Sequence, residues 1–104
     1  MENKSKAETF IGFAMRARKY RIGVNAVGTL KKVNLIIICQ TASENTVKDA
    51  LKLANKFHCT AVLTKQKTLE EITHRENAKV MAITDSALSK AILDNSKEDF
   101  IARN

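Results

Sequence analysis

Residue types that commonly carry catalysis are few in this sequence of 104 residues, and none is arranged for it. The histidines and cysteines lack the spacing of a zinc site, and the cysteines do not form a C-x-x-C motif. They are His58, His74, Cys39 and Cys59. Glu70 and Glu71 are adjacent, so on a helix they point apart, and an acidic pair in a first turn suits the helix dipole. No phosphate loop, dinucleotide glycine motif or nucleophile elbow is present. The sequence predicts no enzyme, no metal and no cofactor.

Basic residues are concentrated in the first third of the chain. Of the net charge of +7, residues 1–34 carry +6, from eight Lys/Arg against two Glu. Residues 35–104 carry +1, from ten Lys/Arg against nine Asp/Glu. Six basic residues and no acidic one lie between positions 16 and 32: Arg16, Arg18, Lys19, Arg21, Lys31 and Lys32. Unbalanced charge of this kind favours a polyanionic partner, although a basic surface that only maintains solubility is the alternative.

Gly23-Val24-Asn25 lies inside this basic stretch and precedes a short helix predicted over residues 26–32. The first N–H groups of a helix can donate to phosphate oxygens, and glycine permits close backbone approach. Asn25 could read a base edge with its amide. The alternative, that Asn25 is only an N-cap and Gly23 only a turn, is equally compatible with the residues. With one tyrosine, Tyr20, and no tryptophan, a base-stacking sheet is not expected.

The surrounding pattern alternates between helices and strands. Apolar spacing predicts helices over residues 6–19, from about 44 to 57, over 68–73 and over the segment that carries Leu88 to Leu93. Continuous apolar runs predict buried strands at 35–39, 59–63 and 79–84, while 19–22 is a connection or a short strand. Capping boxes are expected at Thr41–Glu44, with Ser43 as the alternative cap, and at Thr68–Glu71. Asp85 or Ser86 should cap the last helix.

Buried strands separated by helices predict one domain with a three-layer α/β/α sandwich and a mixed central sheet. The core should span about residues 6–94 and include Phe10, Phe13 and Phe57, while the polar tail 95–104 should fray. The longest apolar run, 35–39, is too short to cross a membrane, and no signal peptide is expected. Cys39 and Cys59 should be buried thiols. The alternative, a disulfide between them, requires that their strands be neighbours. A cytoplasmic protein is predicted.

The order and spacing of several motifs resemble the L-seven-Ae family of ribosomal and kink-turn RNA-binding proteins, in particular its small bacterial YlxQ-type members. The resemblance covers roughly residues 8 to 94. The matching segments are Phe10-Ile11-Gly12-Phe13-Ala14-Met15-Arg16-Ala17-Arg18-Lys19, Gly23-Val24-Asn25, Val33-Asn34-Leu35-Ile36-Ile37-Ile38, Ala42-Ser43-Glu44-Asn45-Thr46, Leu69-Glu70-Glu71-Ile72 and Val80-Met81-Ala82-Ile83-Thr84-Asp85.

The resemblance implies an α/β/α fold and recognition of kinked RNA helices with sheared G·A pairs. In that family a G-x-N-E helix start enters the RNA groove, and a basic residue four places after the Asn assists. Gly23 and Asn25 match, whereas Ala26 and Thr29 occupy the Glu and basic positions, which argues against tight kink-turn binding. Near an extruded nucleotide the resemblance places Glu44, Lys65 and the loop of residues 73–79, which includes His74, Arg75 and Asn77.

Two functions follow as hypotheses. The first is a non-enzymatic protein that binds ribosomal or other structured RNA. Under this hypothesis the ribosome is one candidate partner. The second is a protein–protein adaptor on the same fold in which RNA contact is weak or lost. An RNA-modifying enzyme would need a catalytic partner domain.

Overall fold

The computed structural model describes residues 5–103 and contains a five-stranded mixed sheet. The helices are α1 (Lys6–Arg16), α2 (Val24–Gly28), α3 (Glu44–Phe57), α4 (Leu69–Thr73) and α5 (Ser86–Asp94), and the strands are β1 (Tyr20–Ile22), β2 (Leu35–Ile38), β3 (Thr60–Thr64), β4 (Val80–Ile83) and β5 (Phe100–Ala102). The strand order is β1-β4-β2-β3-β5, in which β2 and β3 are parallel and the other pairs are antiparallel.

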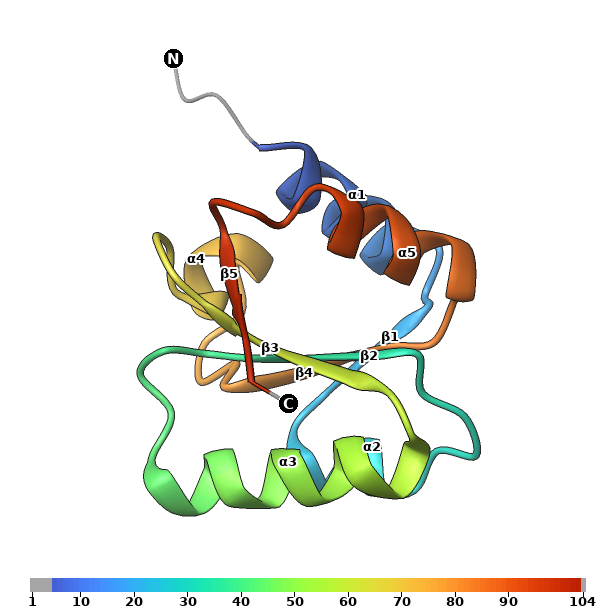
Figure 1. The fold of residues 1–104 in the computed structure, drawn as a ribbon, viewed down its shortest axis with the longest axis vertical. Helices are drawn as coiled ribbons and strands as arrows, with labels where there is room; N and C mark the ends of the chain where they lie inside the picture. Colours follow the sequence, from blue (N-terminus) through green and yellow to red (C-terminus); the bar gives the residue numbers. More distant parts are fainter. Residues whose placement is uncertain (1–4, 104) are drawn as a thin grey trace.

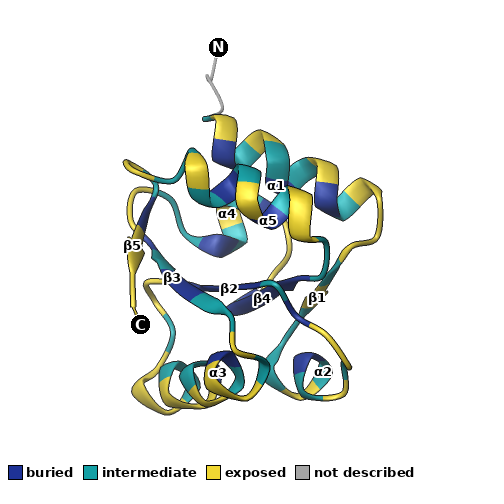
Figure 2. Cartoon of the chain, turned by 45° about the vertical axis from the view of Figure 1, so that its right-hand side comes forward, coloured by how far each residue is buried: buried dark blue, intermediate teal, exposed yellow. Residues whose placement is uncertain are grey.

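Helices cover both faces of the sheet, so the predicted three-layer α/β/α sandwich is confirmed (Figure 1). Helices α1, α4 and α5 lie on one face, and α2 and α3 lie on the other. The central strand β2 is buried along its whole length (Figure 2). Leu35 and Ile37 pack in the first layer, while Ile36 and Ile38 pack in the second. This explains its unbroken apolar run, because alternate side chains of a strand enter opposite layers.

Side-chain caps begin most of the helices. Ser43, rather than Thr41, caps α3 by accepting from the N–H of Thr46. Thr68 and Glu71 form the predicted capping box of α4. Asp85 caps α5 through the N–H of Leu88. These caps place helix starts within a residue or two of the predicted positions because the cap supplies an acceptor for otherwise unpaired N–H groups.

Two boundaries in the basic stretch differ from the prediction. Helix α1 ends at Arg16 instead of continuing to position 19, since Arg18 adopts a left-handed conformation with φ 59°. The chain then enters β1, which the sequence left open between a connection and a strand. Helix α2 begins at Val24, two residues earlier than the predicted 26–32, and ends at Gly28, four residues earlier, so it is two residues shorter than predicted.

The C-terminal segment forms a strand, so the prediction that residues 95–104 fray is wrong for its described part. Strand β5 pairs with β3, with Phe100 opposite Thr64 and Ala102 opposite Val62. Phe100 is buried at 6% exposure and joins the core of the first layer. The prediction that Phe13 is a core residue is also wrong: Phe13 is 42% exposed on α1, where its ring packs edge to face with that of Phe10. The short segment 97–103 has too little apolar periodicity to predict a strand.

The two cysteines lie at opposite ends of neighbouring strands. Cys39 follows β2 and is buried, and Cys59 precedes β3 and is half-buried. Because β2 and β3 are parallel with Leu35 opposite Thr60, these positions cannot be bridged. Among the described residues, no helix is long and apolar enough to cross a membrane.

Candidate nucleic-acid interface

A hollow beside the edge strand β1 gathers three arginines around the single tyrosine. Its lining is Arg18, Tyr20, Arg21, Ile22 and Arg75. The left-handed turn at Arg18 joins α1 to β1, and β1 is held by antiparallel pairing of Tyr20 with Ile83 and Ile22 with Met81. Arg75 comes from the loop after α4. The fold therefore brings a residue 55 positions away onto the basic stretch.

Two of the three guanidinium groups in this hollow donate hydrogen bonds to neutral oxygen atoms. Nη2 of Arg75 donates to Oη of Tyr20 at 3.0 Å, and Nη1 of Arg21 donates to the carbonyl oxygen of Tyr20 at 3.0 Å. Within residues 5–103 the ion pairs are Lys67–Glu8 and Lys79–Glu70, and neither involves an arginine. The arginines of the hollow therefore keep their charge uncompensated by any described carboxylate. Such an arrangement attracts phosphate groups, which guanidinium binds in bidentate fashion.

The start of α2 lies at the end of β1. Gly23 adopts φ 99°, which side-chain-bearing residues rarely adopt, and its N–H donates to the carbonyl oxygen of Val80 at 2.9 Å. Gly23 is the N-cap and supplies no side-chain acceptor. Asn25 is therefore not an N-cap, because it lies inside the helix. Its side chain is exposed and makes no hydrogen bond to a described residue, so the amide remains available.

Asn25 faces a groove between α2 and α3 rather than the arginine hollow. Val24 lines the same groove, and Lys52 and Lys56 contribute positive charge from α3, beside Asp49. Nζ of Lys56 also donates to the carbonyl oxygen of Gly28 at 3.3 Å. Of the residues predicted to contact RNA near the β1–α2 junction, Arg18 and Arg21 thus line the hollow beside β1, whereas Asn25 lines the groove between α2 and α3.

Other residues of the predicted basic site are not gathered at the hollow. Lys32 lines a separate hollow with residues at the C-terminal end of α3, among them Phe57 and His58, and Lys31 precedes it as an exposed residue. Arg16 lies over the ring of Phe13, 4.9 Å from its centroid. Lys19 is exposed, and its carbonyl oxygen accepts from the N–H of Thr84.

The remaining predicted residues lie around the end of the sheet where β2 and β3 finish and β4 begins. Glu44 is the exposed first residue of α3, and Lys65 is exposed directly after β3. His74 ends α4 in a left-handed conformation with φ 58°. Asn77 also has positive φ, at 57°. The order of the strands places these residues at one end of the sheet, and no hydrogen bond or ion pair joins the side chain of Lys65 to the described loop of residues 74–79.

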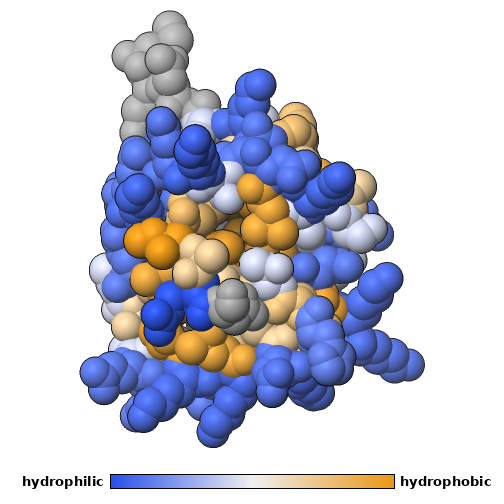
Figure 3. Space-filling view, in the orientation of Figure 1, coloured by the Kyte–Doolittle hydropathy of each residue, from blue (hydrophilic) through white to orange (hydrophobic). Residues whose placement is uncertain are grey.

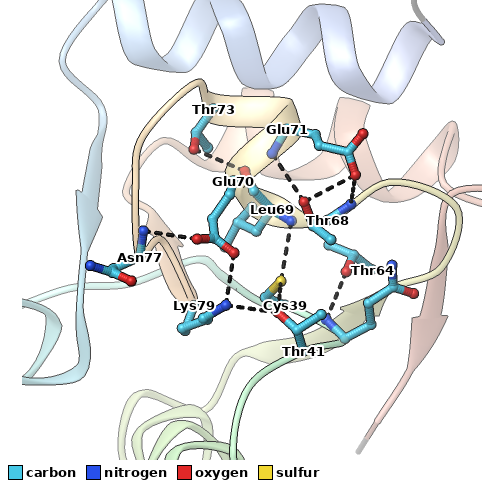
Figure 4. Close-up of polar contacts among 11 residues, drawn as sticks. Cys39, Thr41, Thr64, Thr68, Leu69, Glu70, Glu71, Thr73, Asn77 and Lys79 are labelled. Atoms are coloured by element: carbon cyan, nitrogen blue, oxygen red, sulfur yellow. Dashed lines mark hydrogen bonds and ion pairs between the residues drawn. The ribbon is translucent and has the colours of Figure 1, made fainter.

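A polar network joins this loop to the β2–α3 loop (Figure 4). Nζ of Lys79 donates to Oε1 of Glu70 at 2.7 Å and to Oγ1 of Thr41 at 2.8 Å. Oε2 of Glu70 accepts from the backbone N–H of Asn77 at 2.9 Å. One carboxylate thereby joins α4 to the loop at two points, Asn77 and Lys79, and Lys79 continues the connection to the β2–α3 loop.

The network shifts the protonation of its members. The hydrogen bond from Lys79, followed by that from the Asn77 N–H, lowers the pKa of Glu70, and the same Glu70 contact raises the pKa of Lys79. Nearby, burial acts to raise the pKa of the Cys39 thiol, but hydrogen bonds from Thr41 and the Leu69 N–H, together with the charge of Lys79, outweigh it and lower that pKa.

Sequence reasoning missed two features of the candidate interface. Tyr20 was set aside because it is a lone aromatic residue, although its position among arginines is the basic-aromatic pattern that indicates nucleic-acid contact. The Lys79–Glu70 pair was missed because its members are nine residues apart on different elements, and only the α4 turn brings them together.

Elsewhere the surface offers less for an anionic ligand. A hollow between α1 and the β3–α4 loop is lined by Glu8, Lys67 and Asp99, and its lysine is ion-paired with Glu8 at 3.2 Å. Across the described residues, no three His, Cys, Asp or Glu side chains come close enough to hold a metal ion.

Comparison with known proteins supports the fold. No protein-family model matches the chain, and no curated protein matches it in sequence. Among solved structures, a protein with unknown function from Bacillus halodurans matches with a TM-score of 0.73 and 22% sequence identity. The match covers 88% of this chain and 96% of the other. At this identity the similarity establishes that the two chains share the α/β fold.

Proposed function

We propose that this protein is a non-enzymatic RNA-binding protein of the L-seven-Ae type that binds ribosomal or other structured RNA. The observation that carries the proposal is the set of arginines along β1 that no described carboxylate neutralises: Arg18, Arg21 and Arg75. Phosphate contacts supply most of the affinity in protein–nucleic acid complexes, so a group of arginines without a carboxylate partner is the expected feature of such a surface.

Two neighbouring features support the same assignment. Asn25, exposed on α2 without a hydrogen bond to any described residue, is available for a base edge, as in the family that the sequence resembles. The loop of residues 74–79 borders the same end of the sheet and carries Arg75 into the hollow. Ala26 and Thr29 lack the polar side chains of the family pattern. The proposed RNA is therefore structured, and affinity for a kink-turn is expected to be modest.

The test is filter binding of ribosomal RNA fragments and of a kink-turn RNA at two salt concentrations. Affinity for duplex regions should fall with salt by a log–log slope of roughly 0.9 for each phosphate neutralised. The double variant Arg18→Glu and Arg21→Glu should abolish binding. The matched control, Lys31→Glu and Lys32→Glu, makes the same charge change at the separate hollow and should retain most of it.

Undiminished binding by the arginine variant would exclude this surface. If the wild-type protein bound none of these RNAs, or bound without any response to salt, the proposal would fail and the adaptor hypothesis would gain support. Circular dichroism of both double variants establishes that a loss of binding is not a loss of folding.

A further inference from the structure

The arginine hollow combines charge with an aromatic ring, and this combination suits a particular part of an RNA. Tyr20 is half-buried, since its ring packs partly against the core of the first layer together with Ile22. Tyr20 also lines the hollow, and its hydroxyl oxygen accepts a hydrogen bond from Arg75. The ring is therefore held in place from two sides. A fixed aromatic side chain loses little conformational entropy when a ligand packs against it.

The position of β1 adds a second constraint. It is an edge strand, so one of its sides pairs with β4 and no described strand pairs with the other. The bases of a double helix are stacked and paired, so they cannot lie against the ring of Tyr20 on this edge strand. An unpaired nucleotide can place its base against the tyrosine while its phosphates meet the arginines.

We propose that this hollow, lined by Arg18, Tyr20, Arg21, Ile22 and Arg75, binds an unpaired nucleotide of a single-stranded RNA segment. The base packs against Tyr20, and the flanking phosphates contact the three guanidinium groups. The inference rests on the proposed RNA-binding function and deepens it, because it assigns single-stranded RNA next to a structured element as the ligand of this part of the surface.

The chain provides a direct readout of contact at this position. It contains one tyrosine and no tryptophan, so its intrinsic fluorescence comes from Tyr20 alone. Titration with hexauridylate should quench this fluorescence saturably. An abasic chain with the same number of phosphates should bind more weakly and leave the fluorescence nearly unchanged. Arg75→Gln keeps the tyrosine and should weaken the binding of both chains. Since uracil absorbs the same light in both titrations, the fluorescence decrease of this weakly binding variant measures absorption by the bases and is subtracted.

Variants at position 20 separate stacking from apolar contact. Binding is followed by anisotropy of a fluorescein-labelled hexauridylate. Tyr20→Phe, which keeps an aromatic ring, should bind within about threefold of the wild type, whereas Tyr20→Leu should lose about tenfold, in the range of one base–aromatic stack. Wild-type affinity in the leucine variant, or equal affinity of the abasic and uridylate chains, would overturn the inference. Thermal melting of each variant identifies any loss that comes from unfolding.

The two proposals fail in different ways. If structured RNA binds to the wild type and to Tyr20→Leu alike, and hexauridylate does not distinguish them, the nucleotide site is wrong and the RNA-binding function stands. If hexauridylate binding depends on Tyr20 while no structured RNA binds, the hollow stands and the proposed function is wrong.

Discussion

Arg18 shows how a single residue can contribute charge at a cost in backbone energy. Its φ of 59° lies in the left-handed region, which costs a residue with a side chain about 1–2 kcal/mol relative to glycine. Glycine would relieve this strain, although its greater freedom in the unfolded chain offsets part of the gain. An arginine thus occupies a position where glycine would suit the backbone better. Strain of this kind is found at functional sites.

Replacing Arg18 with glycine or with alanine separates the two effects. Both variants should lose RNA affinity equally because both remove the guanidinium group. Only Arg18→Gly should match or exceed the wild type in stability, by up to about 1 kcal/mol, while Arg18→Ala keeps the strain. Urea unfolding and filter binding measure the two quantities. Wild-type affinity in the glycine variant would remove Arg18 from the interface.

At the scale of elements, Glu70 connects α4 to two points of the loop that follows it, Asn77 and Lys79. Its pKa is lowered in the folded protein by Lys79 and by the Asn77 N–H. A carboxyl group whose pKa is lowered by folding stabilises the folded state at pH values above its ordinary pKa, which is about 4.3 for Glu. This stabilisation is lost as the pH falls from the ordinary pKa to the lowered one. The capping residue Glu71, whose pKa is lowered by Thr68, acts in the same direction.

We therefore expect Glu70→Gln to reduce the pH dependence of stability. Between pH 6 and pH 3 the melting temperature of the variant should fall less steeply than that of the wild type. The control is Glu76→Gln, since Glu76 is exposed and has no ion pair or hydrogen bond with a described residue. Identical slopes for Glu70→Gln and the wild type would show that the network contributes no pH-dependent stability.

Strand β5 is a second element whose contribution can be measured. Phe100 is buried in the first layer, and its neighbour Ile101 is 48% exposed. Figure 3 shows apolar side chains gathered between the polar surfaces of the two helical layers. Phe100→Ala should cost about 3 kcal/mol in the free energy of unfolding, as buried phenylalanines do. Ile101→Ala should change it by about 0.5 kcal/mol or less. Urea denaturation of both variants tests this, and equal midpoints would mean that β5 adds little to the core.

At the scale of the whole molecule, the sheet register determines the behaviour of the thiols. Cys39 lies level with Thr64, five residues along β3 from Cys59, because Ile38 is opposite Leu63. At about 3.3 Å per residue, roughly 16 Å separates the two positions, whereas disulfide-bonded Cα atoms are less than about 7 Å apart. Cys39 is also fully buried despite its lowered pKa.

Mild oxidation should accordingly leave the monomer without an internal disulfide, as measured by intact mass with and without reductant. Iodoacetamide should modify the half-buried Cys59 first, and Cys39 should react only when the chain opens, because access limits a buried thiolate. Peptide mass spectrometry gives the order. Faster labelling of Cys39 than of Cys59 in the native protein would contradict the burial seen here.

The sequence by itself determined the local features of this protein. Apolar runs predicted three buried strands, and helical spacing predicted the amphipathic helices. The Thr68–Glu71 pair predicted the start of α4. Each of these depends on neighbours within a few residues, where periodicity and capping act directly. The basic excess was also readable, because charge is a property of composition.

Only the tertiary structure decided which of those charges lie together. It brought Arg75 to Tyr20, separated Lys32 from the arginines and joined Lys79 to Glu70. It also made the C-terminal segment an edge strand of the sheet. These outcomes depend on the order of strands and on turns between distant elements. That order is set by the packing of two helical layers on one sheet, to which every element contributes and which no short segment encodes.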